Sequence, residues 1–138
     1  MSDPEQEKKF RMAYNLAANR TLESLMERFD ELTESIRSND YDVTYSDGVL
    51  TVKLGSIANV KGEMVNGGTY VINKQTPNLQ IWLSSPLSGP KRFDFVDNVW
   101  IYKHTSEILH DLLQLEFNNY LDPQVTRFKE CEFGARRK

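Results

Sequence analysis

The chain has 138 residues, 39% of them hydrophobic, and a mean hydropathy of −0.56. This composition can fill one hydrophobic core but not two, and no apolar run is long enough to span a membrane. The formal net charge is −3, and a lone cysteine, Cys131, excludes an intramolecular disulfide and a cysteine-based metal cluster within one chain.

We therefore expect a single domain over residues 1–138, with a flexible N-terminal tail at 1–7 and a C-terminal tail at 123–138. The first residues, MSDPEQEKK, are acidic. They lack the Arg-rich, acid-poor character of a transit peptide, so if the protein is imported we expect its leader to have been removed. The single cysteine is compatible with a reducing compartment.

The first predicted element is an amphipathic helix over residues 8–37. Its apolar residues recur at spacings of four and three: Ala18, Leu22, Leu25, Phe29, Leu32 and Ile36. Acidic residues gather on the opposite side, and we call them, with two acids on the following strand, the carboxylate ridge. Its members are Glu23, Glu27, Asp30, Glu31, Glu34, Asp40 and Asp42. Carboxylate oxygens suit iron, but a solvated helical face gives the same pattern.

Six strand-like runs follow, over residues 41–45, 49–54, 69–75, 80–84, 91–96 and 99–103. Turn residues separate them, notably Asp47-Gly48, Pro77-Asn78 and Asp97-Asn98. The long segment 55–68 is either a hairpin tip or a contact surface, and its residues do not decide between the two.

The last predicted element is a second helix, capped by Thr105 or Ser106 and ended by Pro123. Its buried side consists of Ile108, Leu109, Leu112, Leu113, Phe117 and Tyr120. A helix, a meander of strands and another helix predict an α+β fold. We expect a two-layer sandwich, with an antiparallel sheet of about six strands and both helices on one face, which leaves the other face open.

The open face carries an unusual set of side chains. Strand alternation gives Asn73 and Gln75 one face of the first segment, and Gln80 and Trp82 one face of the second. Antiparallel pairing across Pro77-Asn78 brings the amides beside Trp82. Tryptophan is a favoured interface anchor, although it would belong to the core if helices covered this face.

Charge is distributed unevenly along the chain. Residues 21–47 contain eight acidic residues and two arginines, whereas residues 69–103 contain four lysines and arginines and two aspartates. Such a dipole can orient a partner. The acidic total and the single exposed tryptophan do not make the basic, aromatic groove that single-stranded nucleic acid requires, so we expect no nucleic-acid partner.

Two runs, TYVINKQTPNLQIWLSSPLSGPKRFDF and VWIYKHTSEILHDLLQLEF, closely resemble the signature region of the frataxin family, in its eukaryotic branch. The similarity extends upstream through TLESLMERFDEL and YDVTYSDGVLTVKLG and covers the chain from about residue 14 to residue 120. This resemblance implies a protein of the mitochondrial matrix that acts in iron and iron–sulfur cluster metabolism.

The resemblance also implies roles for both surfaces. The carboxylate ridge would bind Fe²⁺ or Fe³⁺ weakly, although Arg11, Asn19 and Arg20 stand where related sequences carry further acids. The open face would dock on a complex of cysteine desulfurase and iron–sulfur scaffold protein and accelerate sulfur transfer. The expected contact residues are Asn73, Gln75, Asn78, Gln80, Trp82 and Arg92.

The sequence leaves two other functions open. The protein could instead be an enzyme, a ferroxidase that oxidises Fe²⁺ and stores the product, or an iron-independent binding module. We expect a monomer that forms oligomers only with iron, and no membrane partner. The resemblance further implies that His104 is a secondary metal ligand and that Val125 and Phe128 anchor the C-terminal tail. His104 and His110 are six residues apart and do not share a helical face.

Overall fold

The computed structural model describes residues 3–136. Helix α1 (Pro4–Glu31) begins four residues before the predicted start, because Asp3 caps it: its carboxylate accepts the Glu5 N–H at 3.0 Å, and Pro4 occupies the first turn. Residues 4–7 of the predicted tail are therefore helical, and residues 1 and 2 lie outside the described residues. A 3-10 turn (Leu32–Glu34) closes the helix, short of the predicted end at Arg37.

Seven of the strands in residues 3–136 form one antiparallel sheet. In spatial order they are β1 (Asp42–Ser46), β2 (Val49–Lys53), β5 (Thr69–Gln75), β6 (Gln80–Ser85), β7 (Gly89–Val96), β8 (Val99–Tyr102) and β9 (Glu107–Ile108). The first six match the predicted runs to within two residues at each end. The seventh was missed because two residues carry no readable alternation.

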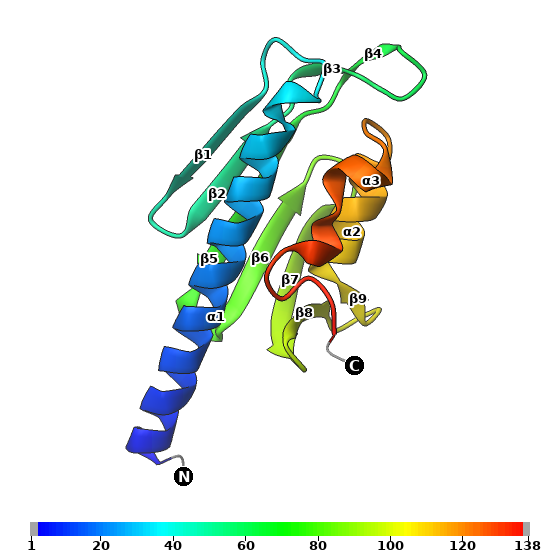
Figure 1. Cartoon of the computed structure of the whole chain (residues 1–138). Helices are drawn as coiled ribbons and strands as arrows, with labels where there is room; N and C mark the ends of the chain where they lie inside the picture. Colours follow the sequence, from blue (N-terminus) through cyan, green and yellow to red (C-terminus); the bar gives the residue numbers. More distant parts are fainter. Residues whose placement is uncertain (1–2, 137–138) are drawn as a thin grey trace.

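Segment 55–68, for which the sequence allowed two interpretations, contains a hairpin of β3 (Ser56–Ala58) and β4 (Met64–Asn66). Its tip reaches the turn that follows the second helix, where the Val60 N–H donates to the Asn119 carbonyl at 2.8 Å. The hairpin closes the end of the domain remote from the N-terminus (Figure 1).

Helix α2 (Leu109–Phe117) starts later than predicted. Ile108 is its N-cap and gives no side-chain hydrogen bond, so the predicted cap at Thr105 or Ser106 is wrong. Both residues lie in the turn before β9, where Ser106 has a φ of 64°. Pro123 does not end this helix but opens a short one, α3 (Pro123–Thr126), capped by Asp122.

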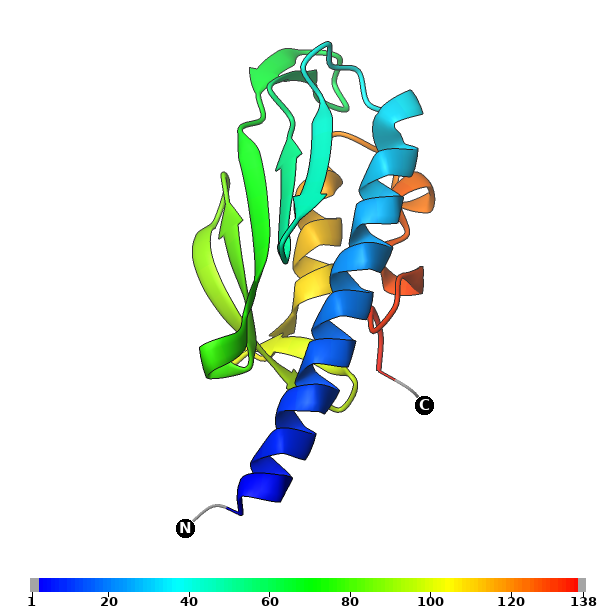
Figure 2. The same cartoon turned by 90° about the vertical axis from the view of Figure 1, so that its left-hand side faces the viewer.

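Helices α1 and α2 pack on the same face of the sheet, and the other face is uncovered (Figure 2). The core between the two layers consists of fully buried side chains: Leu22, Leu25, Phe29, Leu50, Val52, Tyr70, Ile72, Ile81, Phe93, Trp100, Leu109, Leu113 and Phe117. The predicted α+β sandwich is thus confirmed. No helix in residues 3–136 is both long and apolar enough to cross a membrane.

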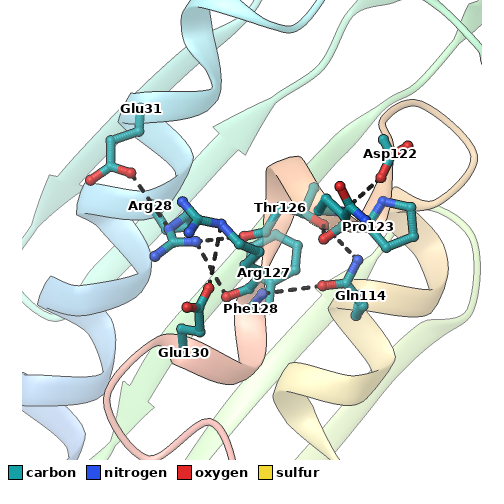
Figure 3. Close-up of polar contacts among 10 residues, drawn as sticks. Arg28, Glu31, Gln114, Asp122, Pro123, Thr126, Arg127, Phe128 and Glu130 are labelled. Atoms are coloured by element: carbon teal, nitrogen blue, oxygen red, sulfur yellow. Dashed lines mark hydrogen bonds and ion pairs between the residues drawn. The ribbon is translucent and has the colours of Figure 1, made fainter.

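The C-terminal segment, residues 123–136, packs between α1 and α2 (Figure 3). Phe128 is fully buried, with its ring 5.2 Å from that of Phe29, whereas Val125 is 37% exposed. Phe128 therefore anchors the segment and Val125 does not, since the α3 turn directs Val125 to solvent. Arg28 of α1 donates to the carbonyls of Thr126 and Arg127 at 2.9 and 3.2 Å, so the backbone of the segment is held as well.

Candidate functional site

The uncovered sheet face aligns the predicted contact residues in cross-strand rows. Asn73, Trp82 and Arg92 form one row across β5, β6 and β7, and Gln75, Gln80 and Asp94 form the next. Directly opposed residues share a face, and the neighbours of Trp82 on β6, Ile81 and Leu83, point to the helices and are buried. The predicted grouping of amides around Trp82 on the open face is confirmed, and Trp82 is half-buried rather than part of the core.

Trp82 is held by neighbours on two sides. Its Nε1–H donates to Gln80 Oε1 at 2.8 Å. The guanidinium carbon of Arg92 lies 4.6 Å from the indole centroid, which is cation–π geometry. Because Arg92 is exposed and has no ion pair with a described carboxylate, its donors remain available to a partner.

These residues border a shallow depression of about 540 Å³. Its lining comprises Asn73, Gln80, Trp82, Leu83, Ser84, Pro90, Lys91, Arg92, Asp94, Tyr102, Lys103 and His104. Gln75 and Asn78 lie outside it, Gln75 at the end of β5 and Asn78 in the exposed turn that joins β5 to β6. The predicted set is therefore grouped only in part.

Asp94 and Lys103 belong to this surface and were not among the predicted site residues. Asp94 Oδ1 accepts the Gln80 Nε2–H at 3.1 Å, and its second oxygen lies 3.8 Å from Lys103 Nζ. Strand alternation gives Asp94 the same face as Arg92, so the sequence contained a signal for Asp94. Lys103 follows the end of β8, where alternation no longer applies.

The two histidines occupy different environments. His104 is exposed in the turn after β8, with its ring 5.1 Å from that of Tyr102. His110 is fully buried in α2, and neither ring nitrogen has a hydrogen-bond partner in the described part of the chain. Burial lowers the pKa of His110 to about 4. The two side chains do not form a common metal site.

Five members of the carboxylate ridge line one side of α1 and its closing turn, and all five are exposed: Glu23, Glu27, Asp30, Glu31 and Glu34. Burial raises the pKa of Tyr41 and of Tyr45, and the nearby carboxylates of Asp30 and Glu23 raise them further. Asp30 therefore lies near Tyr41, and Glu23 lies near Tyr45 of β1.

The structure separates the other two acids from these five. Tyr41 faces α1, with its hydroxyl donating to the Phe29 carbonyl at 2.6 Å, so the next residue, Asp42, points to the open face and pairs across β1 and β2 with Lys53. Asp40 turns to the hairpin, where it accepts the Ser56 N–H at 3.3 Å. The predicted extension of the ridge along β1 is therefore not continuous.

The ridge offers oxygen ligands but no preformed cage. Among residues 3–136, no group of three or more His, Cys, Asp or Glu side chains is placed to hold a metal ion. Arg20 lines the same surface hollow as Glu23 and Glu27, together with Glu132 from the C-terminal segment, which sequence reasoning missed. Exposed carboxylates of this kind fit a loosely bound, hydrated iron ion.

Comparisons with known proteins agree with this fold. The frataxin-like domain family matches residues 8–123. The mitochondrial frataxin homologue of Drosophila melanogaster is 51% identical over 120 residues, which is 83% of this chain and 58% of that protein. The mitochondrial frataxin of Arabidopsis thaliana is 44% identical over 108 residues, covering 77% of this chain and 52% of its own length. The chain thus spans a little over half the length of these relatives.

Solved structures match as well. Yeast frataxin superposes with a TM-score of 0.62 at 39% identity, covering 76% of this chain and 77% of that one. A crystal structure of trimeric frataxin from Saccharomyces cerevisiae, described as complexed with ferrous, has a TM-score of 0.60 at 37% identity and covers 80% of this chain and 86% of its own.

Proposed function

The chain belongs to the frataxin family, and from this premise we propose that it promotes iron–sulfur cluster assembly in the mitochondrial matrix. It does so by docking on a complex of cysteine desulfurase and scaffold protein, where it accelerates persulfide transfer to the scaffold. It acts as an allosteric activator rather than as the catalyst of that transfer.

The half-buried Trp82 on the uncovered sheet face is the observation that carries this proposal. An aromatic side chain already fixed by Gln80 and Arg92 costs little further conformational entropy when a partner covers it. The unpaired guanidinium of Arg92 and the Asn73 amide supply polar contacts beside it. This mixture of an aromatic anchor and a polar rim is typical of a protein interface.

Iron has a separate place in the proposal. The five exposed helical carboxylates, Glu23, Glu27, Asp30, Glu31 and Glu34, would hold Fe²⁺ or Fe³⁺ weakly through oxygen ligands and water. The trimeric yeast relative in its ferrous complex supports iron binding within the family. We propose a monomer as the docking form, with oligomers restricted to iron-loaded protein.

The alternative, a ferroxidase and iron store, would use the same carboxylates. They are spread along an exposed helix, and within residues 3–136 no three of them are grouped to hold a metal ion, so they favour weak binding over a built oxidation centre. The alternative therefore has less support than docking.

Turnover of a purified desulfurase and scaffold complex tests the proposal, with this protein, with Trp82→Ala and with Leu115→Ala. Leu115 is an exposed hydrophobic residue on α2, 63% accessible, and serves as the matched control. We expect the wild-type protein and Leu115→Ala to stimulate turnover, and Trp82→Ala to require a concentration at least about tenfold higher. Equal stimulation by all three would refute the assigned surface. No stimulation by folded wild-type protein, with a complex from its own species, would turn attention to iron oxidation.

A further inference from the structure

The hydrogen bond of the Trp82 indole continues through the Gln80 side chain to Asp94. We propose that Asp94 is a positioning residue for the docking surface: it fixes the Gln80 amide in the orientation that accepts the indole N–H of Trp82. The link to activation rests on the proposed function, whereas the effect on the indole does not.

The first step is the asymmetry of the Gln80 side chain. Its amide presents an oxygen that accepts and an NH₂ that donates, and the two ends differ in nothing else of consequence. The Trp82 indole can only donate and the Asp94 carboxylate can only accept. One orientation therefore satisfies both neighbours, with Oε1 at 2.8 Å from Trp82 Nε1 and Nε2 at 3.1 Å from Asp94 Oδ1. The flipped amide would set two donors against each other and two acceptors against each other.

The second step is the support of this chain of contacts at both ends. Asp94 and Gln80 face each other in the register of β6 and β7, and Lys103 Nζ lies 3.8 Å from the other Asp94 oxygen. On the helix side, the Tyr14 hydroxyl donates to the Gln80 carbonyl at 2.6 Å, which fixes the backbone of Gln80 to α1. The Gln80 side chain thus has a fixed origin and one permitted orientation.

The third step is the consequence for Trp82. With Asp94 present, the hydrogen bond that the indole donates to Gln80 and the stacked Arg92 guanidinium leave the indole a single favoured conformation. Without Asp94, the amide turns over freely and the indole loses its acceptor for part of the time. A partner must then order the indole on binding, which weakens docking by a factor of about three to ten.

Two variants separate positioning from general structure. Asp94→Ala removes the acceptor, whereas Asp94→Asn keeps an oxygen for the Gln80 NH₂ and replaces the charged oxygen that faces Lys103 with an NH₂. The Asp94 side chain is 23% exposed and outside the core, so both variants are expected to fold. Glu63→Ala is the matched control, because it removes the same charge from an exposed position in the β3–β4 hairpin.

The direct readout is the indole N–H resonance of the full chain in a ¹H–¹⁵N spectrum. The chain has two tryptophans. The Trp100 indole is buried and donates to Thr21 Oγ1 at 2.8 Å, so it is an internal reference. We expect Asp94→Ala to shift the Trp82 indole toward the position of a solvated indole and to speed its exchange with water about tenfold. Asp94→Asn and Glu63→Ala should leave it near the wild-type position, and Trp100 should not move in any variant. An unshifted Trp82 indole in Asp94→Ala overturns the inference.

The functional readout is the protein concentration that gives half-maximal stimulation of the desulfurase complex. A higher value for Asp94→Ala with rescue by Asp94→Asn supports positioning. If Asp94→Ala frees the indole but leaves the half-maximal concentration unchanged, the role of Asp94 in docking is overturned. If wild-type protein does not stimulate the complex at all, the proposed function fails, and the spectrum alone then decides whether Asp94 orients Trp82.

Discussion

The open sheet face and the carboxylate ridge are both polar surfaces, yet they are built in different ways. On the sheet face, Trp82, Gln80 and Asp94 are linked by hydrogen bonds of 2.8 and 3.1 Å, and each group has one orientation. On the ridge, Glu31 pairs with Arg28 at 3.6 Å, and the other four helical carboxylates extend into water without an ion pair in the described part of the chain. A fixed surface suits recognition of a shaped partner, whereas a loose one suits steering and weak, hydrated ions.

Acid should destabilise the sheet face most, because the helix layer that supports the sheet contains the buried His110. Its folded-state pKa of about 4 lies below the unfolded value of 6.5, so the unfolded chain binds more protons as the pH falls below 6.5. The unfolding free energy that neutral His110 preserves is therefore fully present above pH 6.5 and is lost progressively as the pH falls toward 4. The loss amounts to about 3 kcal/mol of unfolding free energy.

Urea unfolding at several pH values measures this effect. The variant His110→Leu, of similar volume, should lose most of the slope between pH 6.5 and 4. The assignment is wrong if the slope is the same in both proteins.

Charge reversal should affect docking more on the sheet face than on the ridge. Arg92→Glu removes the cation stacked on Trp82 and should raise the half-maximal concentration for desulfurase activation more than about tenfold. Glu27→Lys reverses a charge on the ridge and should change it less than about threefold at physiological salt, where exposed charges are screened. Effects of equal size would mean that the ridge is also a docking surface.

The smallest expected effect concerns the stability of the ridge itself. Replacing Glu27 and Asp30 with Gln and Asn should raise the melting temperature by about 2 °C, since it relieves repulsion between exposed carboxylates. Added salt should raise the melting temperature of the wild-type protein and leave the variant nearly unchanged. A lower melting temperature in the variant would indicate that these carboxylates stabilise the fold.

Alternation and helical periodicity predicted most of the fold, because they report which side of an element is apolar. They also predicted that Asn73 lies beside Trp82, since pairing across a short turn follows directly from alternation. The register that places Arg92 opposite Trp82 was not predicted and comes from the structure. The same rule could have excluded Asp42 from the ridge: Tyr41 faces the core, so its neighbour must face away.

Other features could not be read from the sequence. Strand β9 has two residues, too few to show a period. The cap expected at Thr105 or Ser106 was wrong because Ser106 takes a positive φ in a turn that the chain needs before β9. The roles of Asp94 and Lys103 depend on which way an amide turns and how far a lysine reaches, which are properties of packing rather than of pattern.

Oxidative footprinting of side chains, with and without the desulfurase and scaffold complex, tests the central claim most directly. It reports the accessibility of Trp82 itself, and the exposed Met12 and Met64, 62% and 61% accessible, provide references within the same chain. We expect the complex to slow oxidation of Trp82 several-fold, while Met12 and Met64 do not slow to the same extent. Unchanged oxidation of Trp82 in protein shown to be bound would contradict it, because the partner would then sit on another surface.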